Sequence, residues 1–185
     1  NFFRRNSRRQ CQSRPCGASL ITPRYRGWAK DYREPPEAAL IADPFRLAGR
    51  EGEAAEYFVA AGERARSLYA NVDALAHYRS ALALGYPEAA GVHEAIGDVL
   101  LLIADYDGAL ASFETAAASA APGRVAVLEH KLGSVYHRRG DWDLAAAHCE
   151  AAIAGATDQA ERARIDVDRS LNEYRRGNAA AALDL

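Results

Sequence analysis

Residues 96–116 read IGDVLLLIADYDGALASFETA, and the pattern of small and aromatic residues in this stretch recurs before and after it. Aligned on the alanine at position 109, the copies are spaced by 35, 36 and 37 residues. A repeat of this length is typical of architectures in which one supersecondary unit stacks on the next, because a single unit cannot bury its own apolar face. The four anchors are Ala74, Ala109, Ala145 and Ala182.

The sequence around these anchor alanines resembles a known repeat. The third copy reads Leu132-Gly133, then Tyr136, then Ala145, which resembles the pattern Leu-Gly-x2-Tyr, Ala-x3-Phe and Pro of the tetratricopeptide repeat (TPR). The resemblance implies an all-α fold, a TPR-type right-handed superhelix of antiparallel helix pairs (an α-solenoid), with about 3.5 repeats plus an N-terminal helix. We place a repeat domain at 36–185, with repeats at about 52–86, 87–121, 122–157 and 158–185, the last one truncated.

Each recurring position has a physical role in such a fold. A glycine inside a helix costs about 1 kcal/mol relative to alanine, which makes sense where another helix must approach closely, and the anchor alanines fit the same contact from the other side. We expect the residue four positions after each anchor to fill the gap between successive repeats, and Pro87 and Pro122 to lie in a first helical turn. The structural repeat positions are Gly62, Ala74, Tyr78, Gly97, Ala109, Phe113, Gly133, Tyr136, Ala145 and Ala182, with Cys149 at the aromatic position of the third copy.

A partner-binding groove is implied by the same resemblance, because the first helix of each TPR pair lines a concave surface. Counting from the small residue of each copy gives a groove that runs from acidic in the middle to basic near the C-terminal end, which suggests a peptide or protein partner with acidic residues at one end. For each single residue the alternative is a solvated helical face. The Lys and Asn clamp with which some TPR domains hold a chaperone's C-terminal carboxylate is absent from the matching positions. The predicted groove residues are Arg66, Glu94, Asp98, His130, Lys131, Ser134, His137, Arg138, Tyr174 and Arg175.

Residues 1–35 differ from the rest of the chain in charge and pattern. They carry nine basic and two acidic residues, whereas the whole chain has a formal net charge of −2. They show no helical period, so we expect an irregular, disordered basic arm. A basic arm can also bind nucleic acid, and a nucleic-acid-associated protein is the alternative interpretation; we favour the charged tail.

Cysteine usage and hydropathy indicate the compartment. The cysteines are Cys11, Cys16 and Cys149, an odd count without a secretory signal, which predicts a reducing, cytoplasmic location. No apolar run approaches the ~20 residues of a membrane helix, so no membrane partner is expected. The chain contains no Met, and we interpret it as a fragment whose open C-terminal repeat could self-associate.

A second resemblance concerns the first copy. Residues 60–78, AAGERARSLYANVDALAHY, look like the helical repeats of large bacterial signalling ATPases and transcriptional regulators, and the resemblance extends over about 37–185. It implies a regulatory or sensor segment of a larger bacterial signalling protein. It carries over no catalytic residue.

Motifs of catalytic chemistry are missing from the sequence. It contains no G-x4-G-K-[ST], no G-x-S-x-G and no H-E-x-x-H. His130 and His137 share a helix face but lack a third metal ligand, and Cys149 at a core position is expected to be an inert thiol. We therefore predict a protein–protein interaction module, not an enzyme, with no cofactor and no metal.

Overall fold

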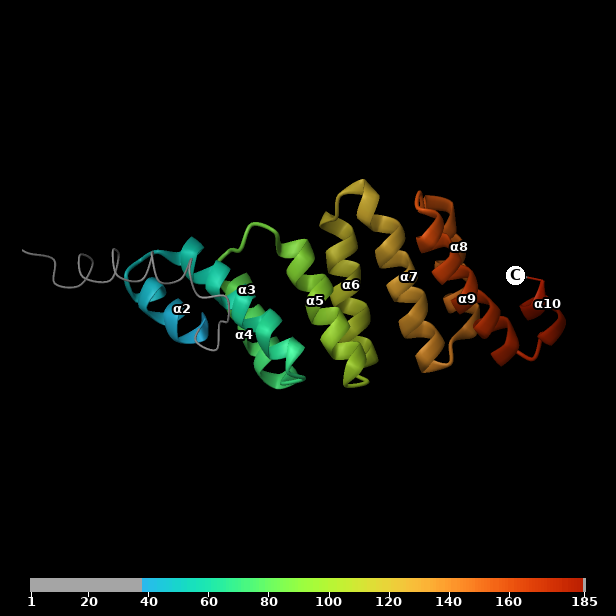
Figure 1. The fold of residues 1–185 in the computed structure, drawn as a ribbon, viewed down its shortest axis with the longest axis horizontal. Coiled ribbons are helices and arrows are strands. Elements are labelled where there is room, and N and C mark those ends of the chain that lie inside the picture. The colour runs from blue at the N-terminus through green and yellow to red at the C-terminus, as the bar shows by residue number, and fades with distance from the viewer. Residues whose placement is uncertain (1–37, 185) are drawn as a thin grey trace, which may run out of the picture.

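The structure of the protein is a computed structural model that describes residues 38–184; the basic arm predicted for residues 1–35, with Cys11 and Cys16, lies outside the described residues. Every regular element in the described part of the chain is an α-helix, so the predicted all-α class is confirmed. The helices follow one another along the long axis of the molecule (Figure 1). Their bounds are α2 Ala38–Leu47, α3 Glu51–Ser67, α4 Asn71–Ala83, α5 Ala89–Leu102, α6 Tyr106–Ser119, α7 Pro122–Arg139, α8 Trp142–Gly155, α9 Gln159–Arg175 and α10 Ala179–Leu183.

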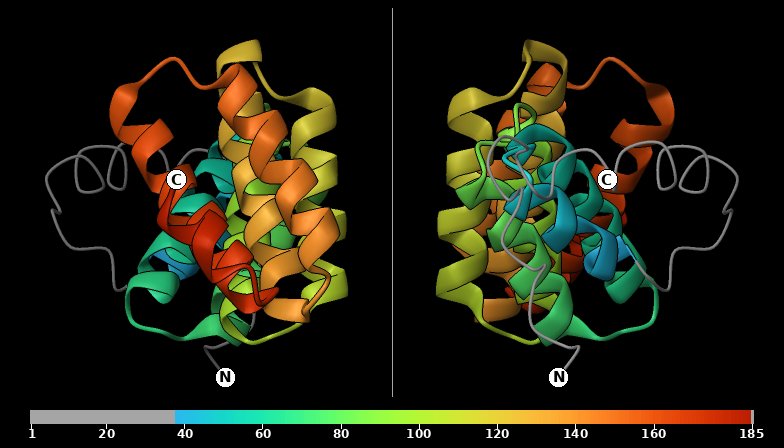
Figure 2. Two further views of the ribbon diagram at one scale, coloured as in Figure 1. Left: turned by 90° about the vertical axis from the view of Figure 1, so that its right-hand side faces the viewer. Right: turned by 90° about the vertical axis from the view of Figure 1, so that its left-hand side faces the viewer.

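Consecutive helices form antiparallel pairs that stack on one another (Figures 1 and 2). The pairs are α3 with α4, α5 with α6, α7 with α8 and α9 with α10, and α2 packs on α3 at the N-terminal end. Neighbouring pairs meet through α4 and α5, α6 and α7, and α8 and α9. The result is the solenoid that the repeat predicts, in which each unit buries its apolar side against the next.

Within each pair, the chain turns through one residue in the left-handed backbone region. The φ angles are +58° at Tyr69, +62° at Ala104, +92° at Gly140 and +89° at Gly177. In all four copies the N–H of the following residue donates to a carbonyl five positions earlier, at 2.9 Å. This is the Schellman arrangement that closes a helix C-terminus. Glycine adopts it without a Cβ penalty, so the strain falls on the first two copies, which carry a side chain there.

Glycine also lies where the two helices of a pair come closest. A Cβ on Gly62 would lie 2.6 Å from the ring of Tyr78, and one on Gly97 would lie 2.5 Å from the ring of Phe113. Both rings are fully buried. Each ring thus covers the glycine of its own repeat. Both rings also belong to the buried cluster that continues into the following repeats, where the sequence predicts that they pack. The close approach explains why glycine stands in mid-helix despite its lower helix propensity.

The third copy repeats this contact with a smaller partner. A Cβ on Gly133 would lie 3.1 Å from the Sγ atom of Cys149, which stands where the earlier copies have a ring. In the fourth copy, Ala182 is only partly buried, whereas the other three anchor alanines are buried. Self-association through this last repeat stays a prediction.

The apolar core is concentrated in the middle of the solenoid. One cluster of buried side chains is continuous from Ala65 on α3 to Val135 on α7. A smaller cluster around Cys149 and Ile165 joins α7, α8 and α9. The C-terminal repeats are therefore held by fewer buried apolar residues than the central ones.

The two prolines that follow complete copies have different positions. Pro122 is the first residue of α7, as predicted, where no N–H donor is needed. The same assignment is wrong for Pro87, because α5 begins at Ala89 and Pro87 lies in the turn before it.

Candidate partner-binding face

The first helices of the four pairs, α3, α5, α7 and α9, follow one another along the molecule (Figure 1). We call the surface that they form the first-helix face. All ten residues predicted to bind a partner come from these four helices. Some of these side chains pair with one another between helices, and others are exposed to solvent.

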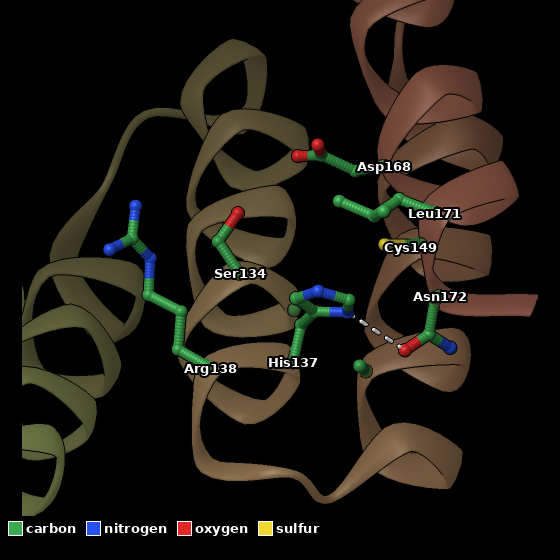
Figure 3. A pocket seen from close by; sticks show the side chains of 9 residues that line it. Ser134, His137, Arg138, Cys149, Asp168, Leu171 and Asn172 are labelled. Carbon is green, nitrogen blue, oxygen red and sulfur yellow. Dashed lines mark hydrogen bonds between the residues drawn. The ribbon is translucent and has the colours of Figure 1, made fainter. Parts of the chain in front are cut away.

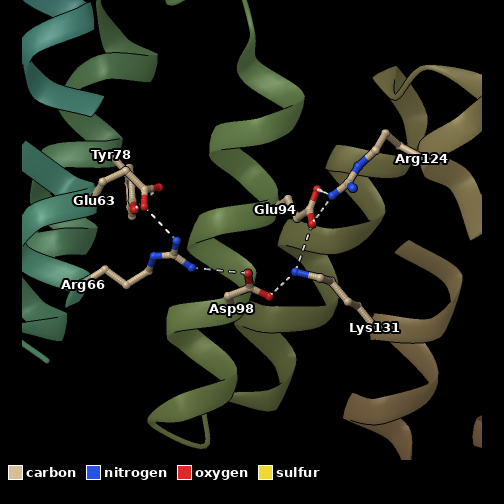
Figure 4. Close-up of polar contacts among 7 residues, drawn as sticks. All are labelled: Glu63, Arg66, Tyr78, Glu94, Asp98, Arg124 and Lys131. Carbon is tan, nitrogen blue, oxygen red and sulfur yellow. Dashed lines mark hydrogen bonds and ion pairs between the residues drawn. The ribbon is translucent and has the colours of Figure 1, made fainter. Parts of the chain in front are cut away.

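Charged residues in the middle of the first-helix face pair across the helices (Figure 4). Arg66 on α3 lies 3.8 Å from the carboxylate of Asp98 on α5. Lys131 on α7 forms ion pairs with both Asp98 and Glu94. Arg124, also on α7, donates to both carboxylate oxygens of Glu94 at 2.6 Å. We call these five residues the ion-pair ladder, and it links three successive repeats.

The ladder is anchored on α3 by Glu63. One carboxylate oxygen of Glu63 accepts a hydrogen bond from Arg66, and the other accepts one from the hydroxyl of Tyr78, both at 2.7 Å. Burial, together with the hydrogen bond to Glu63, raises the pKa of Tyr78 well above its ordinary value. The hydroxyl therefore remains a donor at neutral pH, and the ring that covers Gly62 is also tied to the ladder.

Glu94 is the best-paired acid of the ladder. Burial acts to raise its pKa, but the hydrogen bonds from Arg124 and Lys131 outweigh burial, and the pKa of Glu94 is lowered from 4.5. The carboxylate stays ionised because two cations hold it. Four of the predicted groove residues, Arg66, Glu94, Asp98 and Lys131, thus make their contacts inside the molecule, between repeats.

Two further predicted residues connect α7 to α9. The Nε2 atom of His130 lies 2.7 Å from the carboxylate of Asp168, and this hydrogen bond is the main cause that lowers the pKa of Asp168. The Nδ1 atom of His137 lies 3.1 Å from Oδ1 of Asn172, whose amide nitrogen donates to the carbonyl of Trp142 at 2.8 Å. A carbonyl can only accept, so the Asn172 amide is oriented by Trp142 and His137 must donate from Nδ1. In neutral His137, Nε2 is then the unprotonated nitrogen.

Three residues of this network were not found from the sequence. Arg124 and Asp168 carry no local signal, because their partners are 30 and 38 residues away in the chain. Asn172 is only 2% exposed, and its spacing in the sequence does indicate an inward-facing position. It follows the buried Ile165 by seven residues, which places it on the same face of the helix.

The remaining predicted residues are less enclosed. Ser134 is half-buried, and Arg138, Tyr174 and Arg175 are exposed. On α9 the side chains of Val167, Leu171 and Tyr174 are 66%, 42% and 64% exposed, and their spacing of four and three residues aligns them in one stripe. We combine this stripe with Arg138 and Arg175, the two predicted groove arginines that lie outside the ladder, and call the set the C-terminal patch. It consists of Val167, Leu171, Tyr174, Arg138 and Arg175.

A cavity of about 150 Å³ opens beside this patch, between α7, α8 and α9 (Figure 3). Ser134, His137 and Arg138 line it from α7, Cys149 from α8, and Leu171 from α9. Burial raises the pKa of the Cys149 thiol to about 11. The thiol is therefore protonated at neutral pH, and a thiol in that state is a weak nucleophile. Apolar side chains (Ala145, Cys149 and Leu171) and polar ones (Ser134, His137, Arg138, Asp168 and Asn172) together line the cavity.

Residues 38–184 contain no group of three or more His, Cys, Asp or Glu side chains placed to hold a metal ion. Their helices include none that is long and apolar enough to cross a membrane.

Solved structures with the same arrangement of helix pairs identify the class of fold. The chain is similar to MamA (41–end) from Desulfovibrio magneticus RS-1, with 19% sequence identity and a TM-score of 0.60 over 80% of this chain and 88% of that chain. It is similar to YrrB, described as a TPR protein with an unusual peptide-binding site, with 13% identity and a TM-score of 0.59 over 89% of each chain. The apo form of RapI is 17% identical with a TM-score of 0.65, and the match covers 86% of this chain and 64% of RapI.

The fold is therefore an α-solenoid of the TPR type. No protein-family model matches the chain, and no curated protein matches it in sequence. At these levels of identity the structural likeness defines the architecture alone.

Proposed function

We propose that the protein is an interaction module that binds a peptide segment of a partner protein on the C-terminal patch of the first-helix face. The composition and exposure of the C-terminal patch are the observation that supports this proposal. It combines a stripe of three exposed apolar side chains on α9 with two exposed arginines. Aromatic and arginine side chains are enriched at protein interfaces and contribute a large share of the binding free energy.

The ion-pair ladder argues against a binding site in the middle of the face. Its cations and carboxylates already neutralise one another across α3, α5 and α7. A partner that used them would first have to break these pairs, and breaking a partly buried pair is unfavourable because it leaves an uncompensated charge. Arg138 and Arg175 lie outside the ladder and are exposed.

The charge of the C-terminal patch indicates the chemistry of the partner. Arg138 and Arg175 would attract a segment with carboxylates next to apolar side chains, because complementary charge favours association. The shared fold with YrrB, whose description names a peptide-binding site, supports the peptide as the kind of ligand.

We also propose a cellular setting, in which the module is the regulatory or sensor segment of a larger bacterial signalling protein in the cytoplasm. Its support is the resemblance of residues 60–78 to the helical repeats of signalling ATPases. The coding DNA on both sides of this segment tests the setting. An ATPase encoded upstream in the same frame is expected, and stop codons that close the frame on both sides would contradict it.

The binding function is tested by selecting displayed random peptides on the full chain and measuring their affinity by fluorescence anisotropy. We expect the selected peptides to share acidic and apolar positions. The double variant Arg138→Glu with Arg175→Glu should weaken their binding by about tenfold or more, since each charge pair at an interface contributes of the order of 1 kcal/mol or more.

Arg79→Glu is the matched control, because Arg79 is exposed on α4, a second helix. It should leave binding unchanged. If the double variant binds as well as the unmodified protein, the C-terminal patch is not the site. If the selection yields no peptide that binds, the function itself is refuted.

A further inference from the structure

The cavity beside the C-terminal patch exists because the third copy lacks the aromatic residue of the first two. Tyr78 and Phe113 each place a ring over the glycine of their own repeat. In the third copy the same position holds Cys149, and no ring covers Gly133: a Cβ there would meet the Cys149 sulfur at 3.1 Å and the Ala145 carbonyl oxygen at 3.3 Å. The space that a ring would fill is left between α7, α8 and α9.

The dimensions and lining of this cavity suit a ring. Its volume is about 150 Å³, and an apolar cavity of about that volume is large enough to hold benzene. Gly133, Ala145, Cys149 and Leu171 supply the apolar part of its lining. Figure 3 shows Cys149 and Leu171 facing this space from α8 and α9. Because Leu171 is also an exposed residue of the C-terminal patch, the cavity adjoins the surface on which we propose that a peptide binds.

Polar side chains also line the cavity, and their contacts determine which of them can meet a ligand. His137 donates from Nδ1 to Oδ1 of Asn172. Arg138 is exposed at the rim and lies outside the ion-pair ladder. Asp168 also lines the cavity, but its carboxylate is held by His130 at 2.7 Å. The guanidinium of Arg138 extends on the exposed side of α7 away from α9 (Figure 3), where it can meet a carboxylate of a residue next to the one in the cavity.

We infer that this cavity is an anchor site for an aromatic side chain of the partner peptide, which takes the place of the ring missing from the third repeat, with an adjacent carboxylate of the peptide on Arg138. The inference rests on the proposed peptide-binding function and names the residue class that the site selects. The cavity sets the aromatic preference, and the arginine sets the preference for an acidic neighbour.

The test uses three blocked tripeptides, Glu-Phe-Glu, Glu-Ala-Glu and Lys-Phe-Lys, titrated into the isotope-labelled full chain and followed by NMR. Glu-Phe-Glu is expected to shift the amide signals of Gly133, Ser134 and Leu171. Glu-Ala-Glu should bind about tenfold more weakly or worse, because it buries no ring. Lys-Phe-Lys should also bind more weakly, because its charges oppose Arg138.

Two substitutions at one position change the cavity in opposite directions. Cys149→Phe restores the ring of the earlier copies, and we expect it to weaken Glu-Phe-Glu by about tenfold or more while the melting temperature stays equal or rises. Cys149→Ala enlarges the cavity and should keep the binding. If Cys149→Phe does not fold, Cys149→Leu fills part of the same space and should weaken binding in the same direction.

Different experimental results would overturn the anchor site and the proposed peptide-binding function. Undiminished binding of Glu-Phe-Glu to a folded Cys149→Phe variant, or no binding to the unmodified chain, would overturn the anchor site. The peptides selected by display would still report on the C-terminal patch through the Arg138 and Arg175 variant. Equal binding of Lys-Phe-Lys and Glu-Phe-Glu would overturn the role of Arg138.

Discussion

Ala104 occupies the turn position at which the third and fourth copies carry glycine, and its φ of +62° lies in the left-handed region. An L-residue with a Cβ is disfavoured there by roughly 1–2 kcal/mol, partly offset by the greater unfolded-state entropy of glycine. We expect Ala104→Gly to raise the free energy of unfolding by about 1 kcal/mol in urea denaturation. Ala111→Gly, at an exposed position inside α6, should lower it by about 0.5–1 kcal/mol, and a decrease for both variants would contradict the assigned strain.

The glycines inside the first helices are expected to differ in their tolerance of a methyl group. In Gly97→Ala the new Cβ would lie 2.5 Å from the buried ring of Phe113, which cannot move away easily. We expect a loss of about 1–3 kcal/mol in the free energy of unfolding. In Gly133→Ala the Cβ would meet the Sγ atom of Cys149 at 3.1 Å and the carbonyl oxygen of Ala145 at 3.3 Å, beside the cavity.

The sulfur has space to move into but the backbone carbonyl of Ala145 does not, so Gly133→Ala should lower the free energy of unfolding by less than Gly97→Ala, and the better helix propensity of alanine, worth about 1 kcal/mol, offsets part of that loss. Thermal melting of the two variants side by side checks the comparison. Equal losses at both positions would mean that the third copy is packed as tightly as the second and that its cavity is not accessible to the sulfur.

At the scale of elements, we expect the side-chain link between α5 and α7 in the ion-pair ladder to depend on pH. The folded state lowers the pKa of Glu94 below 4.5 through the hydrogen bonds from Arg124 and Lys131, which outweigh burial. The stabilisation from a lowered pKa is present at pH values above 4.5 and is lost as the pH falls through the lower value of the folded state.

We therefore expect Glu94→Gln to lower the free energy of unfolding at neutral pH and to make it fall less steeply below pH 4.5. Urea denaturation over a series of pH values measures both effects. Glu114→Gln is the control, because Glu114 is exposed on α6. An unchanged acid dependence in Glu94→Gln would show that the pair with Arg124 and Lys131 contributes nothing to folding.

At the scale of the whole molecule, stability should vary along the solenoid. The largest buried cluster extends from α3 to α7, whereas α8 and α9 share a smaller one and the five-residue α10 contributes no buried residue. In a repeat protein each unit contacts only its neighbours, so local opening follows the local core. Hydrogen exchange is expected to be slowest in α5, α6 and α7 and fastest in α10, and uniform protection would contradict this view.

Much of the architecture was predictable from the sequence, because the determinants of a helical repeat are local and recur. The spacing of Ala74, Ala109 and Ala145 places the helix pairs, and a mid-helix glycine such as Gly97 signals a close helix contact. The candidate site was predictable only in part. The sequence placed Lys131 and Glu94 on the first helices but did not show that they pair with each other.

The sequence by itself determined the all-α repeat, the helices that present the first-helix face, and the absence of an aromatic residue at position 149. Only the tertiary structure decided which charges of that face are already paired, where Asn172 is buried, and that the gap at Cys149 becomes a cavity. The physical reason is the range of the interactions. Helix formation and repeat spacing depend on neighbours within one unit. The ion pairs of the ladder join side chains 30 or more residues apart, and the cavity needs side chains from three helices.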